Sequence, residues 1–499
     1  MLRSPAMAAH MAPAPELAAH DAGAPVERLS SIRLLSGASI FRRGNAQEDD
    51  VLDLLQTSED FLGELLAQCG ARLGSPDHVC FTATAGMRAL QPGLPWAEVG
   101  SPADVVLVRQ EVLDTTNLFW FHQYAEFEPL DLADGAFTRV RRLFETGLGT
   151  MLQYRFRPGP GEDVLVVAER LHSAVVDQNI GRVRNDKEAH QNPCPQAPHL
   201  EDALTDIGVL CFLQRCQDLP PSLPRLIGAF REHGPISITL VVTDLVDGDL
   251  FYYVQSGLLP PGEDTVKAVM RQLLPAVQYL DDRDIGHRDI SLESISVNNH
   301  NGNGNPFQIK LMHFTQAVKT RTASGCSLRY FRQCGKPYYR APEVYVPRAG
   351  ELRVLAPFGA DGGAVVFADC VDPAHRGWQP LVQLPLDAVE GQECQADVWG
   401  YEVPPVDVFA MGVCLFVLAY QIPPWQCAQQ TDAIFHWVQR HGLTQLLVQW
   451  NRPLLSPEAM RLLSRMLSTN PAERCSVQDC LTDVWFADPA PAGAEIGAA

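Results

Sequence analysis

Three short segments of this chain combine residue types that could bind phosphate and move a proton. Residues 147–149 read Gly-Leu-Gly, a turn that lets backbone N–H groups approach an anion. Residues 287–289 read His-Arg-Asp, which places a carboxylate beside a cation, and residues 313–315 read His-Phe-Thr. Phosphoryl transfer needs the phosphates held and the nucleophile aimed, and it asks little covalent chemistry of the protein.

These segments need secondary structure elements to position them, and the sequence predicts several. A strand-like run precedes Arg170, and a second buried strand at 240–243 runs into a polar turn. Residues 266–280 have the spacing of an amphipathic helix that leads to His287. The longest apolar run, 409–422, has about 14 residues, which suits a buried core helix and is too short to span a bilayer.

In this order the segments resemble the motifs of eukaryotic protein kinases of the serine/threonine type, and the resemblance covers residues 139–487. Residues 287–294 resemble the catalytic loop H-R-D-x-x-x-x-N, and residues 341–343 read Ala-Pro-Glu. Glu343 would form a buried ion pair with Arg474. The resemblance implies an α+β fold with two lobes, a small β-rich N-lobe and a mainly helical C-lobe.

On the catalytic side, the resemblance implies that Asp289 accepts the proton of the substrate hydroxyl, with Arg288 beside it. Ser291 stands where these kinases usually have a lysine. Lys336 stands where the motif G-T-P-x-Y has a threonine. One hypothesis is that Lys336 restores a cation near Asp289; the alternative is a surface lysine with no role.

On the nucleotide side, Gly147 and Gly149 resemble the first two glycines of G-x-G-x-x-G, but the third position is Leu152. Arg170 replaces the lysine of V-A-I-K, and the swap is not conservative because arginine is longer, planar and forked. Asp206 falls near the position of the glutamate that pairs with that lysine. The alternative is that Arg170 and Asp206 are solvent-exposed residues with no role.

Residues 240–251 resemble the segment between the two lobes of kinases, the hinge, which binds adenine. Asp244 and Leu245 follow the strand, Thr243 would be the gatekeeper, and Asp249 would lie near the ribose. A generic strand, turn and helix would have a similar pattern.

Both positions expected to bind metal have changed. Ser294 stands at the asparagine of the catalytic loop, and His313 stands at the aspartate of D-F-G. Magnesium prefers hard oxygen ligands, and imidazole is a poor substitute. The resemblance therefore implies ATP as the ligand, whereas these two residues argue against Mg²⁺ and give no confident metal site.

The remaining residues predict further units. Residues 1–29, rich in Ala and Pro, are predicted to be a disordered tail, as are residues 488–499. Residues 30–112 show strand patterns at 31–35, 38–42, 79–82 and 105–108 and a helical pattern at 50–69. This order resembles the ubiquitin-like β-grasp fold; another small α+β domain is the alternative. Residues 113–138 would be a linker, and residues 344–405 a β-rich insertion in the kinase-like domain.

The net charge and the cysteine spacing indicate which classes of partner and which cellular compartment to expect. The 499 residues carry a formal net charge of −20, which argues against nucleic-acid and anionic-membrane binding. The 13 cysteines are scattered and lack Cys-x-x-Cys spacing, which indicates reduced thiols in the cytoplasm or nucleus.

Three functions fit these patterns. The first is a catalytically impaired pseudokinase that regulates or scaffolds other proteins, for example an active kinase or a signalling complex. The second is an active serine/threonine kinase with atypical metal ligation. The third is an adaptor that works through the ubiquitin-like domain.

Overall fold

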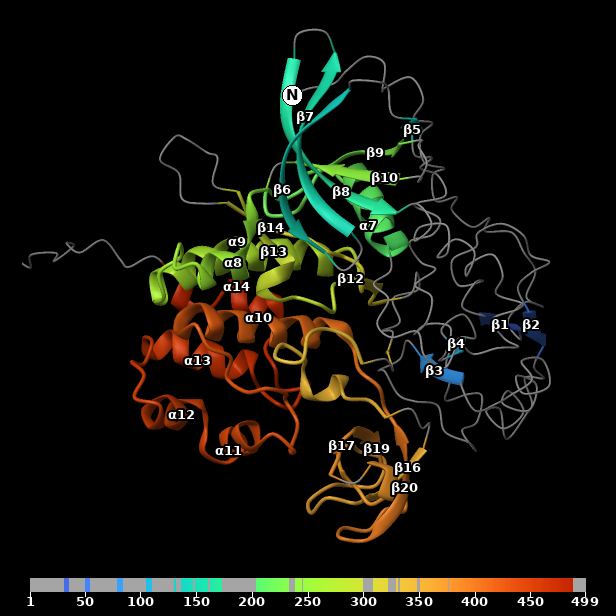
Figure 1. Ribbon diagram of the computed structural model, residues 1–499. Coiled ribbons are helices and arrows are strands. Elements are labelled where there is room, and N and C mark those ends of the chain that lie inside the picture. Colours follow the sequence, from blue (N-terminus) through green and yellow to red (C-terminus); the bar gives the residue numbers. More distant parts are fainter. Residues whose placement is uncertain are drawn as a thin grey trace, which may run out of the picture. The chain divides into compact units, whose positions relative to one another are not determined.

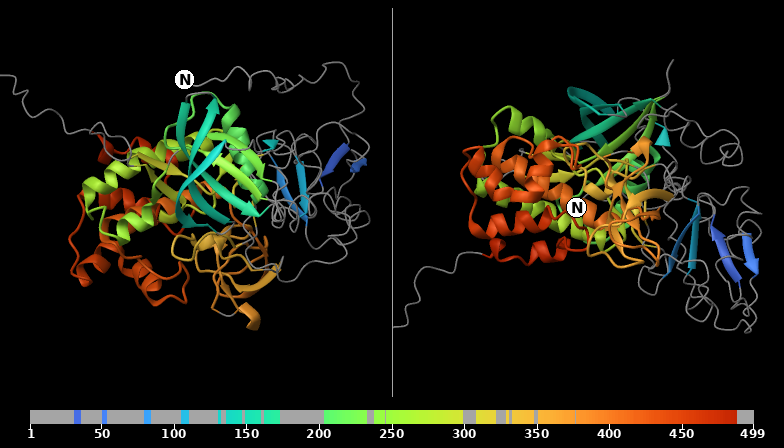
Figure 2. Two further views of the ribbon diagram at one scale, coloured as in Figure 1. Left: turned by 45° about the horizontal axis from the view of Figure 1, so that its top comes forward. Right: turned by 90° about the horizontal axis from the view of Figure 1, so that it is seen from below.

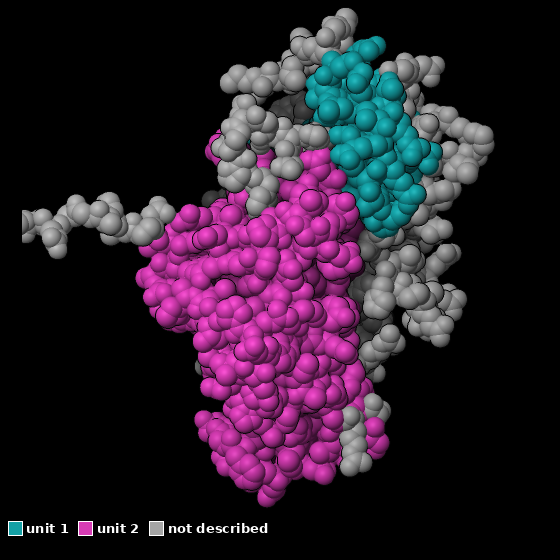
Figure 3. Space-filling model, turned by 60° about the vertical axis from the view of Figure 1, so that its left-hand side comes forward, with its two compact units in different colours: residues 1–216, 225–246, 321–328 teal, residues 217–224, 247–320, 329–499 magenta. Residues whose placement is uncertain are grey.

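The structure is a computed structural model, and it divides into two compact units (Figures 1 and 3). It describes most of residues 136–487, with gaps at 147–148, 160–161, 173–202, 233–237, 245, 299–307, 322–328, 331–332, 348–350 and 376, and short strands at 31–35, 50–53, 79–83, 105–109 and 130–131. The second unit comprises residues 217–224, 247–320 and 329–499, and the first comprises the rest. Each unit is described separately below.

The first unit contains a six-stranded sheet in the order β5-β9-β10-β8-β7-β6. Its bounds are β5 Leu130–Asp131, β6 Phe137–Glu145, β7 Gly149–Gly159, β8 Glu162–His172, β9 Leu226–Glu232 and β10 Ile238–Thr243, with helix α7 at Ala203–Arg215. The predicted domain start at residue 139 falls inside β6, and β5 lies within the predicted linker. This β-rich unit is the N-lobe of the expected fold.

Alternation along the strands builds the core of this sheet. Leu152, Tyr154 and Phe156 of β7 lie on one face and pack with Ala168 of β8. The ring of Phe137 stacks on Phe156 at 4.5 Å between centroids, which extends the cluster to β6. Leu152 therefore serves the core, where the kinase motif has its third glycine.

Four strands of the N-terminal region form a separate sheet in the order β2-β1-β4-β3. They are β1 Ser31–Leu35, β2 Asp50–Asp53, β3 Val79–Ala83 and β4 Val105–Arg109. The predicted helix at 50–69 is wrong at its start, because Asp50–Asp53 pairs antiparallel with β1. Its apolar residues Val51 and Leu52 suit a strand as well as a helix. The other strand predicted for the hairpin, 38–42, lies outside the described residues, and the ubiquitin-like assignment stays a prediction.

The second unit is mainly helical, as expected for a C-lobe (Figure 1). Its helices are α8 Leu250–Gln255, α9 Glu263–Asp281, α10 Val403–Tyr420, α11 Ala433–His441, α12 Leu443–Gln449, α13 Pro457–Met466 and α14 Val477–Leu481. The short strands are β11 Gly248–Asp249, β12 Ile285–Gly286, β13 Ile295–Asn298, β14 Gln308–Leu311 and β15 Val318–Lys319. The predicted helix 266–280 is confirmed within α9.

Helix α10 is the core of this unit. Its residues from Val406 to Tyr420 are all buried. It is long and apolar enough to span a membrane by composition, but 89% of its residues are buried inside the fold. That burial is what a core helix shows, in agreement with the prediction from the 409–422 run.

The predicted β-rich insertion forms a five-stranded antiparallel sheet in the order β17-β19-β20-β16-β18. The strands are β16 Glu351–Leu355, β17 Val365–Phe367, β18 Asp369–Cys370, β19 Leu381–Gln383 and β20 Glu393–Val398. The insertion ends earlier than residue 405, because α10 already begins at Val403. Figure 2 shows this sheet beside the helices of its unit.

Candidate functional site

The loop that carries Asp289 is fixed by a buried carboxylate of the core helix. Asp407 of α10 accepts hydrogen bonds from the backbone N–H of His287 at 2.7 Å and of Arg288 at 2.8 Å. Burial raises the pKa of Asp407 to about 7, and the two N–H groups oppose that rise. Asp407 therefore positions the loop through its backbone.

Arg288 lies buried in a polar and aromatic setting. Its backbone has φ 64°, an uncommon conformation for a residue other than glycine. Its Nε donates to the carbonyl of Gln316 at 2.7 Å, and its guanidinium carbon lies 4.8 Å from the ring centroid of Tyr330. Nη1 donates to the hydroxyl of Tyr401 at 3.4 Å. No local sequence pattern indicates this tyrosine pair, because Tyr401 follows the last strand of the insertion and forms a β-bridge with the distant Tyr330.

Asp289 and Lys336 form an ion pair, so the hypothesis that Lys336 places a cation at Asp289 is confirmed as a contact. Lys336 Nζ lies 3.4 Å from Oδ1 and 3.3 Å from Oδ2 of Asp289, and it donates to Ser291 Oγ at 2.9 Å. The Lys336 N–H also bonds Oδ1. Burial raises the pKa of Asp289, and Lys336 opposes that rise.

Ser294 is engaged by its own loop. Its Oγ accepts the N–H of Ser291 at 2.8 Å and donates to the carbonyl of Ser291 at 2.9 Å. Ser291 Oγ accepts the N–H of Ser294 in return, and the pair forms a capping box on the 3-10 turn Leu292–Ser294. The side chain is buried. Ser294 thus stabilises the turn instead of presenting a free oxygen, and it does not fit a magnesium ligand.

His313 also does not fit that role. It follows β14 with φ 65°, and burial lowers the pKa of its imidazole to about 4, with like-charge repulsion from Lys336 and His287. The neutral ring offers a nitrogen where magnesium prefers oxygen. Among the residues the structure describes, there is no cluster of three or more His, Cys, Asp or Glu that could hold a metal ion.

The lowered pKa of His313 predicts an acid-sensitive contribution to stability. The unfolded chain binds a proton here below about pH 6.5, but the folded protein does so only near pH 4. Stability from this group is therefore complete above pH 6.5 and is lost as the pH falls toward 4. His313→Asn, which tolerates positive φ, should remove a dependence of about 1 kcal/mol per pH unit.

The measurement is the difference in free energy of unfolding between the wild type and His313→Asn at several pH values from 7 to 4.5. The wild type should lose its advantage on acidification. The exposed His441 provides the control, since His441→Asn removes an imidazole at the surface of the same domain. Equal slopes for the two variants would contradict the prediction.

In the first unit, Gly149 begins β7 and is held by a hydrogen bond within its own turn. Its N–H donates to Thr146 Oγ1 at 2.9 Å, and a Cβ here would lie 2.3 Å from the carbonyl oxygen of Arg170. Glycine is therefore needed for the close approach of β7 to β8. This N–H is already bonded, which weakens its predicted role toward phosphate. Gly147 lies outside the described residues.

The other predicted nucleotide residues are spread over both units. Arg170 is exposed on β8, opposite Thr150 and Leu240, and Asp206 is buried in the first turn of α7. Asp244 follows β10, and its Oδ1 accepts the N–H of Arg225 at 3.1 Å. Leu245 lies outside the described residues.

Asp249 has a local structural role. Its Oδ1 accepts the N–H of Tyr252 at 2.6 Å, so it is the N-cap of α8. Burial raises the pKa of Asp249, and this bond opposes the rise.

The scaffold ion pair predicted between Glu343 and Arg474 is present. Arg474 Nη1 lies 2.6 Å from Oε1 of Glu343, and Nη2 lies 3.0 Å from Oε2. Arg474 also donates to the carbonyls of Ser468 and Pro405. The arginine therefore joins the end of the activation segment to the start of α10.

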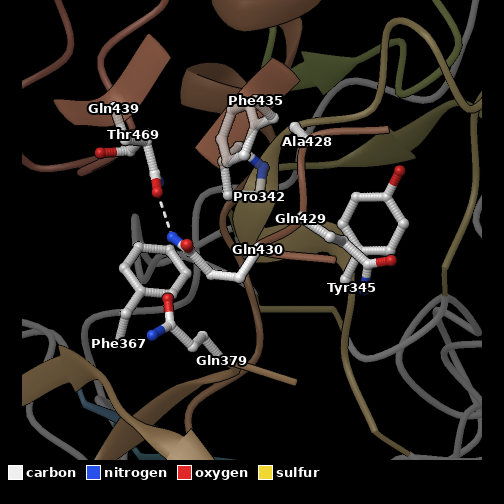
Figure 4. Close-up of a pocket in the computed structure, with 10 residues that line it drawn as sticks. All are labelled: Pro342, Tyr345, Phe367, Gln379, Ala428, Gln429, Gln430, Phe435, Gln439 and Thr469. Carbon is white, nitrogen blue, oxygen red and sulfur yellow. Dashed lines mark hydrogen bonds between the residues drawn. The ribbon is translucent and has the colours of Figure 1, made fainter. Parts of the chain in front are cut away.

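A pocket of about 140 Å³ lies in the second unit (Figure 4). Phe367 and Gln379 of the insertion face Pro342, Phe435 and Gln430, and no charged side chain lines it. Gln430 donates to Gln439 and contacts the His436 ring nitrogen, so its amide is used within the fold. None of the predicted catalytic or nucleotide residues lines this pocket.

Comparisons with known proteins agree with the fold and the motifs. The family described as "Protein kinase domain" matches residues 198–351 and 399–486. The intervening gap coincides with the insertion. A probable serine/threonine-protein kinase, fhkE, of Dictyostelium discoideum is 25% identical over 266 residues, which are 53% of this chain and 29% of that protein.

Two further relatives have the same level of identity. The carbon catabolite-derepressing protein kinase of Candida tropicalis is 25% identical over 253 residues, 50% of this chain and 30% of its own length. The gamma catalytic chain of phosphorylase b kinase, liver/testis isoform, of Bos taurus is 25% identical over 272 residues, 53% of this chain and 50% of its own. The match thus spans half or less of each of these proteins.

The chain contains a protein kinase domain and belongs to the eukaryotic protein kinase-like superfamily. Its β-sheet N-lobe and helical C-lobe are those of the bilobal kinase fold. A kinase domain implies ATP binding, usually with Mg²⁺.

Proposed function

We propose that this chain is a catalytically impaired kinase, a pseudokinase that works as a regulatory or scaffolding module. The observation that carries the proposal is the state of Ser294. Its hydroxyl accepts a hydrogen bond from the N–H of Ser291 at 2.8 Å and donates one to the carbonyl of Ser291 at 2.9 Å. A residue that should ligate metal instead closes the turn that holds the loop together.

The second metal position supports the same proposal. His313 is neutral at physiological pH because burial lowers its pKa to about 4. It supplies neither the charge nor the oxygen that an aspartate would give to a magnesium ion. Kinase turnover requires both metal positions and the lysine of the V-A-I-K motif, which is Arg170 on β8 here. The replacements at positions 294, 313 and 170 argue that this domain acts by binding other proteins and not by transferring phosphate.

An active serine/threonine kinase with atypical metal ligation is the second candidate. The observation in its favour is the contact of Lys336 with Asp289 and Ser291. A cation beside the carboxylate favours its ionised form against the effect of burial and could hold a phosphoryl oxygen, as the lysine missing at position 291 would.

The partners proposed for the pseudokinase are other proteins in the cytoplasm or nucleus, for example an active kinase or a signalling complex. The net charge of −20 supports protein partners over nucleic acid or anionic membrane. ATP is the proposed nucleotide, and Mg²⁺ is not expected to support its binding. An adaptor that acts through residues 30–112 would instead capture the same partners with that segment alone.

Transfer of labelled γ-phosphate from ATP by the full chain tests the proposal, with magnesium and then manganese. We expect no transfer above that of Asp289→Ala, which controls for contaminating kinases. Transfer that disappears in Asp289→Ala would establish the second candidate.

A repair experiment gives a positive readout. Ser294→Asn with His313→Asp should raise nucleotide affinity in magnesium by about tenfold or more, since a charge-assisted contact contributes roughly 1.5–3 kcal/mol. His441→Asp adds the same charge at an exposed site and should change nothing. Tight binding of magnesium–ATP by the unrepaired protein would contradict the argument from the metal positions.

A further inference from the structure

The insertion displays three large apolar side chains at one of its ends. Phe358 is 83% exposed, Leu386 is 75% exposed and Val389 is 53% exposed. They belong to two loops, residues 356–364 and 385–392. Exposed apolar groups of this size add little to folding, and when clustered they commonly mark an interaction surface.

Hydrogen bonds between the chain segments hold these loops beside one another. Gly363 N–H donates to the carbonyl of Pro385 at 3.2 Å, and Gly391 N–H donates to the carbonyl of Ala356 at 2.9 Å. Within the second loop, Gln392 N–H bonds the carbonyl of Val389 at 3.1 Å. The two loops thus form one surface, which we call the insertion tip.

Two of the three apolar side chains, Phe358 and Leu386, lie against glycines of the same loops. Gly391 has φ 70°, and a Cβ on it would lie 3.1 Å from the ring of Phe358. Gly363 has φ 81°, and a Cβ on it would lie 3.0 Å from Cδ2 of Leu386. Phe358 and Leu386 therefore each rest on a glycine backbone and remain 83% and 75% exposed. A surface ordered in this way loses little conformational entropy when it binds.

The charge of the tip indicates what it binds. Asp361, Asp387 and Glu390 are exposed on the same two loops, which contain no lysine or arginine. Among the described residues, none of these three acids forms an ion pair, whereas Glu393 nearby pairs with Arg353 at 3.7 Å. The tip therefore combines apolar anchors with uncompensated negative charge.

We propose that the insertion tip is a docking surface for a basic, hydrophobic peptide segment of another protein. An aromatic or aliphatic side chain of the segment packs on Phe358, Leu386 and Val389. Flanking lysines or arginines face the acids of the tip. Docking here does not depend on whether the domain transfers phosphate, so it extends the proposed function without resting on it.

Selection of a displayed library of random twelve-residue peptides on the full chain tests this proposal. Enriched peptides should pair Lys or Arg with Leu, Phe or Trp. One enriched peptide, labelled with fluorescein, is then titrated with the wild type and with variants by anisotropy. Phe358→Ser with Leu386→Ser should weaken binding by about tenfold or more, as removal of central apolar anchors does.

The charge variant Asp361→Asn, Asp387→Asn, Glu390→Gln should also weaken binding and reduce its dependence on salt. The matched control carries Val448→Ser and Glu458→Gln, an exposed apolar residue and an acid on helices α12 and α13, and should bind as the wild type does. Thermal unfolding checks that every variant is folded.

Three results would overturn the proposal. The first is enrichment of peptides without basic residues, and the second is equal affinity for the tip variant and the control. The third is a dimer in sedimentation that Phe358→Ser with Leu386→Ser converts to a monomer. That last result would assign the tip to a second copy of this chain.

Discussion

Glu343→Ala is expected to lower the free energy of unfolding of the kinase domain by about 3–5 kcal/mol. Glu343 and Arg474 have side chains only 1% and 0% exposed, and their two contacts are 2.6 and 3.0 Å long. Truncating the glutamate leaves the guanidinium charge buried. The bonds of Arg474 to the Ser468 and Pro405 carbonyls remain, but they do not neutralise it.

Denaturant unfolding followed by tryptophan fluorescence measures this loss. Glu393→Ala is the matched control, because Glu393 also pairs with an arginine, Arg353, but both side chains are more than half exposed. Exposed pairs contribute about 0–1 kcal/mol. Comparable losses for the two variants would show that burial does not set the contribution of the Glu343–Arg474 pair.

Asp407→Ala should destabilise the domain by roughly 2–6 kcal/mol. The substitution leaves the buried N–H groups of His287 and Arg288 without their acceptor, and each unsatisfied group costs about 1–3 kcal/mol. Asp407→Asn retains one acceptor and places an amide donor against the other N–H, so its loss should be intermediate.

Hydrogen exchange gives a second, local readout for Asp407. The amides of His287 and Arg288 should exchange faster in Asp407→Ala than in the wild type, because their acceptor is gone. Asp361→Ala, which removes an exposed acid without an ion pair among the described residues, is the control for both measurements. Unchanged exchange at His287 and Arg288 would argue against the role of Asp407 in holding the loop.

The sequence predicted best those parts of the structure that depend on a short-range pattern of apolar residues or on one ion pair between recognised motifs. The apolar periodicity of 266–280 predicted α9, and the continuous apolar run predicted the buried α10. Comparison with the kinase motifs, in which a lysine is missing at position 291 and gained at 336, suggested the hypothesis that Lys336 lies near Asp289, and the two residues are in contact.

The rest depended on contacts that no local pattern encodes. Tyr401 reaches Arg288 only because the chain returns from the insertion at that point. The need for glycine at position 149 depends on how closely β7 approaches the Arg170 carbonyl of β8. The capping box of Ser291 and Ser294 satisfies backbone hydrogen-bonding groups of the turn. Alignment of Ser294 with the asparagine of the kinase motif does not indicate this role.

The two ends of the insertion sheet have a consequence for how this domain tolerates extra chain. Strands β16 and β20 are the first and last of the insertion, and they pair antiparallel, with Glu351 opposite Asp397. The chain thus leaves the helical body and returns to it at neighbouring points. For the kinase domain, the whole insertion is therefore equivalent to one closed loop. The entropic cost of closing a loop grows only with the logarithm of its length. Insertions of very different size could occupy this position at nearly the same cost to the kinase fold.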